Sequence, residues 1–261
     1  MTAIVSIHSF RRGAGKSTIA ANIGAALAMT GARVGIVDAN LPSPSMHVLF
    51  NLAESEMRYT FNDFLRHRCD IEQTAVDVTR RLSAGRSGHL YLTPSSFAAH
   101  EIVRATRDGY DADLLYNGFR ALAQSLTLDI LIVDTYAGLG EETLLMLALA
   151  DSLIVVLRPD QRDYQGTGVI VDVARRLELP RVHAIVNELP AVLEQAAVRA
   201  EVERTYRCEV IGTLPHDEIM ITMPRPSIVA VHYPHHPITA TFQSISARLI
   251  DKSGPPSSQS C

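Results

Sequence analysis

A short segment near the start of the chain, residues 9–18 (SFRRGAGKST), combines residue types that bind phosphate. Gly13 and Gly15 lack a Cβ atom, so the backbone N–H groups around them can turn inward and donate to phosphate oxygens. Lys16 can reach the outer phosphates of a nucleotide, and the hydroxyl of Ser17 can bind a divalent cation. Because an apolar run precedes this segment and an Ala-rich stretch follows it, the order predicts a strand, a phosphate-binding loop and a helix.

Lysine is rare elsewhere in the chain, which makes its presence in this loop informative. Of the 24 Lys and Arg residues only Lys16 and Lys252 are lysines, so the other 22 are arginines. A compact ammonium group fits between phosphates in a tight loop where a planar guanidinium does not. The lysine at position 16 therefore indicates a chemical requirement.

The elements that must position this loop can be read from the pattern of apolar residues. Seven short runs are predicted to be strands, at residues 4–7, 34–37, 90–92, 130–133, 153–156, 182–186 and 210–212. Helical patterns occupy residues 16–29, 61–66, 112–126, 142–149, 165–177, 194–206 and 238–250. Continuously apolar strands that alternate with helices are typical of a doubly wound, mostly parallel sheet flanked by helices, so the fold class is α/β. We expect one P-loop NTPase-like domain over residues 1–252, with helices and an exposed loop within 54–111, and a disordered polar tail at 253–261.

Polar residues stand at the ends of several of these strands. Ligands bind at the carboxyl ends of the strands in such a sheet, so we expect Asp38, Asp134 and Asn187 to converge near Lys16. A carboxylate at the end of a buried strand is costly unless a cation compensates it. Asp134 and Ser17 are therefore the first candidates to hold Mg²⁺, and Asp38 is a candidate for a metal-bound water or for Lys16. An Asp134 that only caps the following loop is the alternative.

The overall composition excludes several classes of protein. With 47% hydrophobic and 20% charged residues the chain is globular, and a net charge of −4 gives no general attraction to nucleic acid or anionic lipid. Cys69, Cys208 and Cys261 are scattered, which argues against a disulfide framework and a zinc or iron-sulfur site and favours the cytoplasm. The longest apolar stretch, 144–157, is interrupted by Asp151 and is shorter than the about 18 residues of a membrane span.

These motifs resemble the MinD/ParA family of deviant Walker-type ATPases, whose phosphate loop reads K-G-G-x-G-K-[ST]. Residues 37–40 (VDAN) resemble the family's switch I segment, D-x-D, and residues 129–138 (DILIVDTYAG) resemble its switch II strand, D-y-x-x-x-D-t-p-a-G. Asn187 matches the position of an adenine-reading Asn, and residues 214–217 (LPHD) match a P-x-D loop beside the base. The resemblance covers nearly the whole chain and implies binding of ATP and ADP with Mg²⁺ and an ATP-dependent homodimer.

The resemblance also implies roles for individual residues. It implies nucleotide contacts from Arg11, Arg12, Gly13, Ala14, Gly15, Lys16, Ser17, Thr18, Asn187, Pro215 and Asp217. It implies catalytic roles for Lys16, Arg11, Asn40 and Asp38, and metal binding by Ser17, Asp134 and Asp38. In the family the first lysine of the loop reaches across the dimer interface to the partner's nucleotide, and Arg11 matches that lysine in charge. The alternatives are that Arg11 and Arg12 are merely solvated and that Asn187 only supports a turn.

Two of the departures from the family pattern bear directly on the chemistry. Arg12 replaces a glycine, so either its side chain swings outward or the loop differs locally. Asn40 replaces the aspartate that positions the attacking water. An amide can still orient water but cannot take a proton, so we expect slow hydrolysis rather than none.

Three functions remain open from the sequence. The first is a switch ATPase that dimerises with ATP and positions or partitions a cellular cargo such as DNA or the cell-division machinery. The second is a nucleotide-binding adaptor with little or no hydrolysis, which Asn40 favours, and the third is a metabolic P-loop enzyme or kinase. The expected partners are a second copy of the chain and a regulatory or cargo protein.

Surface partners are less well defined by the sequence. Arg199, Arg204 and Arg207 recur on one helix and make non-specific DNA a candidate, although glutamates interleave with them. The apolar stripe of the last helix favours packing on the sheet over membrane binding. A cluster of three histidines, His232, His235 and His236, lacks Cys or Glu and contains prolines, so a loop is expected there rather than a metal site.

Overall fold

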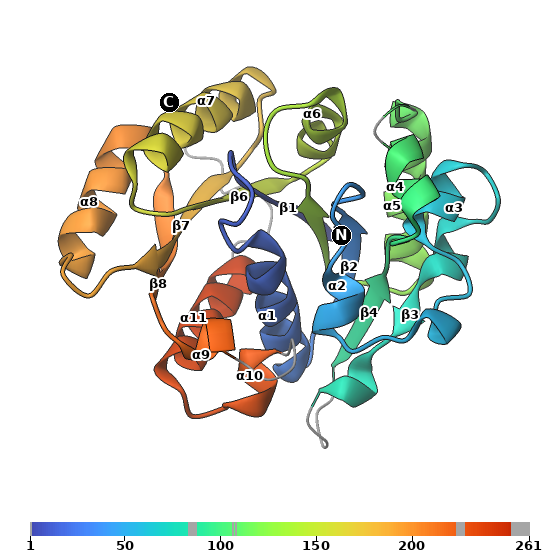
Figure 1. The fold of residues 1–261 in the computed structure, drawn as a ribbon, viewed down its shortest axis with the longest axis horizontal. Helices are drawn as coiled ribbons and strands as arrows, with labels where there is room; N and C mark the ends of the chain where they lie inside the picture. The colour runs from blue at the N-terminus through green and yellow to red at the C-terminus, as the bar shows by residue number, and fades with distance from the viewer. Residues whose placement is uncertain (1, 83–87, 106, 108, 223–227, 252–261) are drawn as a thin grey trace.

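The computed structural model describes residues 2–82, 88–105, 107, 109–222 and 228–251. Lys252, Cys261 and the predicted polar tail 253–261 lie outside these residues. Within the described part, one sheet runs through the whole molecule and carries helices on both faces (Figure 1).

The sheet has eight strands in the order β3-β4-β2-β5-β1-β6-β7-β8. The strands are β1 (Ala3–His8), β2 (Arg33–Ala39), β3 (Val76–Asp77), β4 (His89–Thr93), β5 (Ile130–Thr135), β6 (Ser152–Leu157), β7 (Val182–Leu189) and β8 (Glu209–Pro215). All pairings are parallel except that of β3 with β4. The predicted α/β class and all seven predicted strands are confirmed.

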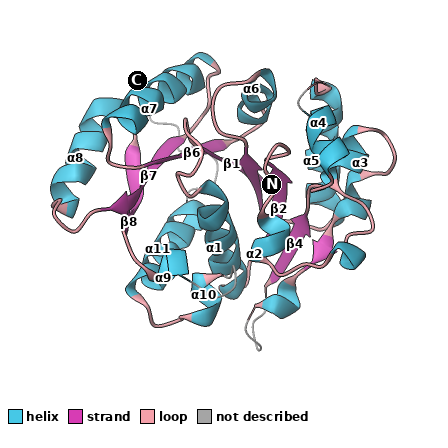
Figure 2. Cartoon of the chain, in the orientation of Figure 1, coloured by secondary structure: helices cyan, strands magenta, loops and turns pink. Residues whose placement is uncertain are grey.

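Helices cover both faces of this sheet, as Figure 2 shows. They are α1 (Lys16–Met29), α2 (Met46–Leu49), α3 (Phe61–Leu65), α4 (Ala99–Ala105), α5 (Ala112–Ser125), α6 (Glu141–Ala148), α7 (Gln161–Arg176), α8 (Gln195–Tyr206), α9 (Ile219–Thr222), α10 (Val229–His232) and α11 (Pro237–Asp251). Short 3₁₀ turns lie at Glu54–Glu56, Ile71–Thr74 and Thr79–Arg81. Among these helices none is both long and apolar enough to cross a membrane.

Three apolar clusters hold the layers together. One face of the sheet packs against α1, α10 and α11, where Phe242, Ile245 and Leu249 are buried, so the last helix packs on the sheet as expected. The other face packs against α3 and α5 over β2 and β5, and against α7 and α8 over β6 and β7. Because helices cover both faces, the central strands are apolar on both sides rather than alternating.

Two differences from the predicted elements have clear causes. The sequence pattern did not indicate β3, because a pair of residues is too short for a visible alternation. Helix α7 begins at Gln161 rather than at the predicted residue 165, because the Asp160 carboxylate accepts the backbone N–H groups of Arg162 and Asp163 and caps the first turn.

Candidate functional site

The loop between β1 and α1 has the conformation that its glycines allow. Gly13 and Gly15 both have positive φ angles, 78° and 92°. A Cβ atom at Gly15 would overlap the side-chain amide nitrogen of Asn187, which lies at the end of β7. Glycine is therefore required at position 15 both for the backbone and for the close approach of the two segments.

A cavity of about 260 Å³ opens at the N-terminus of α1. It is lined by Arg12, Gly13, Gly15, Lys16, Ser17, Thr18, Asn40, Ser43, Ser45, Tyr136 and Ala137. The first turn of α1 directs unpaired backbone N–H groups and the positive end of the helix dipole to this end of the helix, which favours a bound anion. The cavity brings together most of the predicted loop residues and Asn40.

Lys16 is buried at this helix start. Burial lowers the pKa of its ammonium group, Asp134 opposes that shift, and the charge of Arg12 adds to it. A desolvated ammonium gains more than a solvated one from an incoming phosphate, because less water has to be displaced. Its position agrees with the predicted role in phosphate binding.

Ser17 and Asp134 meet across the loop. The Ser17 hydroxyl donates to Oδ2 of Asp134 over 2.6 Å, while Oδ1 of Asp134 is buried and has no hydrogen-bond partner among the described residues. Burial raises the pKa of Asp134 to about 6, although the Ser17 hydrogen bond and Lys16 oppose the shift. A buried carboxylate oxygen without a partner, next to a hydroxyl and a phosphate-binding loop, fits the few protein ligands that Mg²⁺ uses beside phosphates and water.

Asp38 stands next to Asp134 in the register of β2 and β5, but its oxygens have other partners. They accept the backbone N–H groups of Asn40, Ser45 and Met46. Burial and the neighbouring Asp134 raise the pKa of Asp38 to about 7. Asp38 does not line the cavity. It holds the segment 40–46 against the strand ends.

Asn40, the predicted water-orienting residue, lies beside the phosphate loop. It lines the phosphate cavity, is largely buried, and its Oδ1 atom has no partner within the described residues. The side chain lines the cavity but its oxygen is closed to solvent, so it can accept a hydrogen bond from a water in the cavity only after the amide turns toward it. The geometry is thus compatible with orientation of a water molecule and supplies no base.

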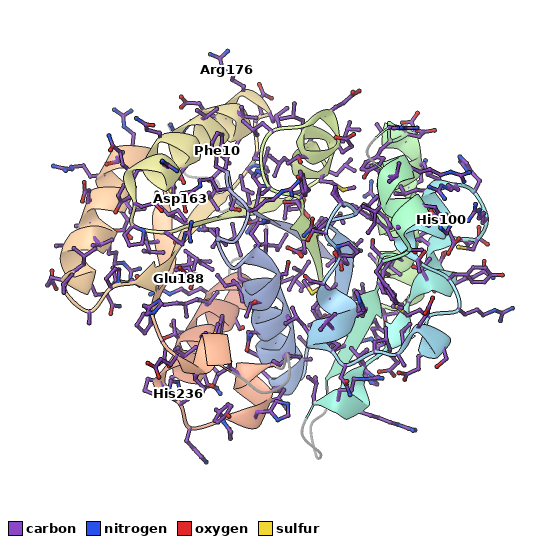
Figure 3. All side chains as sticks on the ribbon, in the orientation of Figure 1. Phe10, His100, Asp163, Arg176, Glu188 and His236 are labelled. Atoms are coloured by element: carbon purple, nitrogen blue, oxygen red, sulfur yellow. The ribbon has the colours of Figure 1, made fainter. Side chains whose placement is uncertain are left out.

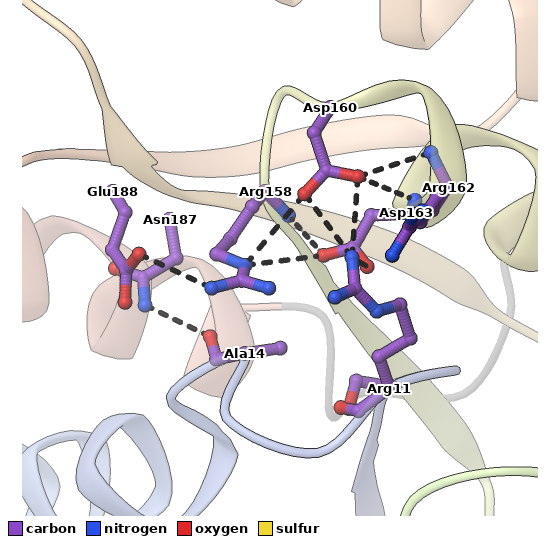
Figure 4. A network of polar contacts seen from close by, with 9 residues as sticks. Arg11, Ala14, Arg158, Asp160, Arg162, Asp163, Asn187 and Glu188 are labelled. Carbon is purple, nitrogen blue, oxygen red and sulfur yellow. Dashed lines mark hydrogen bonds and ion pairs between the residues drawn. The ribbon is translucent and has the colours of Figure 1, made fainter.

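Arg11 lies away from the cavity and pairs within its own chain. Its guanidinium lies 3.3 Å from carboxylate oxygens of both Asp160 and Asp163, at the start of α7 (Figure 4). Asp163 is almost fully buried and also pairs with Arg158. Arg158 in turn reaches Glu188 at the end of β7. The network connects the loop with α7 and β7, a role for which the sequence gave no signal.

Two further contacts of the loop could not be read from the sequence. Phe10 replaces a glycine of the ordinary phosphate loop, and its ring lies so close to Gly166 of α7 that a Cβ atom there would overlap it. Figure 3 shows Phe10 and Asp163 in this region near α7. The guanidinium of Arg12 lies 4.7 Å from the centre of the Tyr136 ring, and Arg12 lines the phosphate cavity.

His8, the last residue of β1, is a buried group that the sequence analysis missed. Its Nδ1 atom lies 2.8 Å from the Thr135 hydroxyl, and that hydroxyl donates to the carbonyl of Ile7. Nδ1 must therefore be the donor to Thr135, which leaves Nε2 unprotonated. Burial and the charge of Lys16 lower the pKa of His8 to about 3, so the ring is neutral.

The residues predicted to read the base lie at the ends of β7 and β8. Asn187 donates from Nδ2 to the carbonyl of Ala14 over 2.9 Å and so supports the phosphate loop directly. Pro215 ends β8, and Asp217 accepts the backbone N–H of Ile219. Asp217 also lies 3.7 Å from His236, which Figure 3 shows beside α9.

The histidine cluster is only partly a loop. His232 is the last residue of α10, whereas His235 and His236 follow in the turn before α11. Across the described part of the chain, no group of three or more His, Cys, Asp or Glu side chains is placed to hold a metal ion.

Several known proteins are similar to this chain in sequence. Residues 1–73 match the ParA family, under the description NUBPL iron-transfer P-loop NTPase. An uncharacterized ATP-binding protein of Methanocaldococcus jannaschii is 28% identical over 251 residues, which cover 96% of this chain and 88% of that protein. The septum site-determining protein MinD of Synechocystis is 26% identical over 224 residues, covering 85% and 79%.

Solved structures share the fold over nearly the full length. MinD in the MinC:MinD cell division complex of Aquifex aeolicus superimposes with a TM-score of 0.80 at 22% identity, covering 98% of both chains. MinD of Pyrococcus horikoshii, solved as a complex with Mg-ADP, gives a TM-score of 0.79 at 19% identity and covers 95% of this chain and 96% of that one. The sheet with its flanking helices is thus the fold of MinD.

Proposed function

Since the chain belongs to the ParA/MinD family of P-loop NTPases, we propose that it is an ATP-driven switch that hydrolyses ATP slowly and dimerises when ATP is bound. The observation that carries this proposal is that Lys16 and Ser17 line one cavity at the start of α1, while the Ser17 hydroxyl donates to the buried Asp134 behind it. An ammonium group, a hydroxyl and a carboxylate with a free oxygen are what a magnesium-bound triphosphate requires.

Each residue has a distinct part in binding. The N–H groups of the loop and of the first turn of α1 hold phosphate oxygens, and Lys16 neutralises part of their charge. Ser17 and Asp134 hold Mg²⁺, which neutralises phosphate charge when it is bound. The Mg-ADP complex of the MinD of Pyrococcus horikoshii supports binding of a nucleotide with Mg²⁺.

The rate of hydrolysis is expected to depend on Asn40. The side chain lines the cavity, and an amide there can orient water but cannot remove a proton. Loss of a general base commonly costs about 10²- to 10⁴-fold in rate. Slow turnover suits a switch, because the ATP-bound state must persist long enough to act on a partner.

The partner is proposed to be another protein rather than DNA. The Aquifex aeolicus MinD is found in complex with MinC, and we propose a regulatory or cargo protein in the same sense here. Of the arginines that made DNA a candidate, Arg199 pairs with Glu203 at 3.2 Å and also donates to the carbonyl of Val210. These contacts reduce the charge available to phosphates on that helix.

The binding and switching steps can be tested separately. Calorimetry should detect binding of ATP that requires Mg²⁺, and a sizing column should show a dimer with ATP and a smaller species with ADP or without nucleotide. A folded protein that takes up no magnesium-dependent ATP would overturn the whole proposal. Binding without any change in size would remove the switch and leave the second candidate.

That second candidate is a nucleotide-binding adaptor that does not hydrolyse ATP, and Asn40 is the observation that favours it. The substitution Asn40→Asp restores a carboxylate at the same place. We expect it to raise phosphate release by about tenfold or more over the natural chain, because a base then faces the cavity. Asn40→Ala is the control and should slow any release. An unchanged rate in Asn40→Asp would show that Asn40 does not limit hydrolysis.

A further inference from the structure

Two adjacent arginines of the phosphate loop have opposite surroundings. Arg11 is neutralised by Asp160 and Asp163, each at 3.3 Å. Arg12 makes no ion pair with any carboxylate in the described ranges, and its guanidinium lies over the ring of Tyr136 instead. The charge of Arg11 is therefore already neutralised by carboxylates of its own chain, whereas the charge of Arg12 has no carboxylate partner among the described residues.

Arg12 and Tyr136 both depart from the family pattern, which has a glycine and a proline at these places. They come from the loop after β1 and from the end of β5, and they contact each other only in the folded chain. Stacking occupies the face of the guanidinium and leaves the N–H donors at its edge free. The ring of Tyr136 thus holds Arg12 in place without consuming its hydrogen-bonding capacity.

The stacked pair forms the wall of the phosphate cavity. Both side chains line the cavity of about 260 Å³ that also contains Lys16 and Asn40. They also line a neighbouring cavity of about 220 Å³. Glu142 is the acidic residue that lines this second cavity, and it forms no ion pair with Arg12. The charge of Arg12 is close enough to Lys16 to influence it. Arg12 is exposed, and it lines the same phosphate cavity as Lys16 and Asn40.

We propose that Arg12 binds the terminal phosphate of ATP in its own subunit, so that a single chain distinguishes ATP from ADP. The inference rests on the function proposed above and adds to it a specificity-determining residue. A guanidinium makes two parallel hydrogen bonds with a phosphate, and an arginine supplied by the same chain can stabilise the charge of a terminal phosphoryl group. Arg11, held by two carboxylates, then anchors the loop to α7 instead of carrying this contact.

The test compares affinities for MgATP and MgADP in single chains. Calorimetry is done at protein concentrations at which a sizing column shows a monomer. We expect the natural chain to prefer MgATP and Arg12→Ala to lower that preference about tenfold, with little change in MgADP binding. Arg12→Lys keeps a charge but loses the planar fork, so it should retain part of the preference. Tyr136→Leu, which removes the stacking, should fall between Arg12→Lys and the natural chain.

Arg162→Ala is the matched control. Arg162 is exposed on α7 near the same loop but lines neither cavity, so its removal takes away one positive charge and should leave the preference unchanged. Retained MgADP binding shows that each variant is folded. A preference that survives in Arg12→Ala, or that appears only in the dimer, would overturn the inference. Absence of MgATP binding by the natural chain would instead count against the proposed function.

Discussion

The phosphate cavity at the start of α1 and the segments at the ends of β7 and β8 lie at the same edge of the sheet but are built differently. Six of the eleven residues that line the cavity come from the segment 12–18, and its phosphate-binding chemistry follows from their types. At the other segments, Asn187 supports the loop through Ala14, and Asp217 contacts a turn near His236. The first region is organised around a ligand, while in the second the polar groups already have protein partners.

The difference shows where binding free energy should come from. A buried ammonium group and an unpaired carboxylate oxygen gain new partners when a ligand enters. Asn187 must give up or share an existing hydrogen bond to contact a base, so its net gain is smaller. We therefore expect substitutions at the phosphate cavity to have larger effects on nucleotide affinity than those at the ends of β7 and β8.

The largest effect is expected from Lys16→Ala. The change removes the desolvated ammonium at the start of α1, and MgATP affinity should fall by about 100-fold or more, equivalent to about 3 kcal/mol. Calorimetry with MgATP measures the loss, and circular dichroism confirms the fold. Lys16→Arg is the control for charge and should also bind poorly, because a planar fork does not fit this loop. Near-natural affinity in both variants would contradict the comparison.

The second largest effect is expected from Asp134→Asn, which should weaken magnesium-dependent ATP binding but increase the stability of the fold. Magnesium dependence of ATP binding should be lost. The nucleotide-free chain should gain roughly 1–3 kcal/mol of unfolding free energy at pH 8, because a buried carboxylate whose pKa is raised to about 6 is removed. A buried carboxyl group with a raised pKa destabilises the fold only when the pH lies above its ordinary pKa of 3.8. The full destabilisation is reached when the pH exceeds the raised pKa of the folded chain. The gain should therefore shrink as the pH falls and vanish near pH 4, as measured by chemical denaturation.

Asp38→Asn is the matched control for this prediction. It also removes a buried carboxylate with a raised pKa, but the oxygens of Asp38 accept three backbone N–H groups. An amide offers only one oxygen, so we expect no gain or a net loss of stability. Equal stabilisation by both substitutions would show that the backbone contacts of Asp38 contribute little.

The smallest effects are expected at the ends of β7 and β8. Asn187→Ala removes the hydrogen bond to the buried Ala14 carbonyl, so the unfolding free energy should fall by about 1–2 kcal/mol and MgATP affinity by less than about tenfold. His236→Gln removes a partly exposed contact with Asp217 that is an ion pair only when the histidine is protonated. It should change stability by less than about 0.5 kcal/mol. An affinity loss at Asn187 as large as that at Lys16 would break the comparison.

Sequence-based prediction succeeded for features encoded by neighbouring residues and failed for contacts between distant segments. Strand and helix positions were recoverable because continuous apolar runs and the Gly-Lys-Ser spacing are local features. The start of α7 was misplaced because its cap is an aspartate side chain that the apolar pattern does not include. Arg11 pairs with Asp160 and Asp163, which no local pattern could place beside it, and its expected contact with a partner chain stays a prediction. The tail 253–261 and the boundary at 252 remain predictions outside the described residues.

Residue order alone determined the α/β class, the phosphate loop and the candidates Ser17 and Asp134 for Mg²⁺, because periodicity and motif spacing act over a few neighbouring residues. The tertiary structure decided which of the two adjacent arginines, Arg11 or Arg12, pairs with carboxylates of its own chain. That choice depends on α7 bringing two carboxylates to Arg11 and on β5 bringing the ring of Tyr136 to Arg12. Electrostatic and stacking contacts act through space between segments far apart in the chain. The different partners of Arg11 and Arg12 are therefore determined only when the sheet and helices pack together.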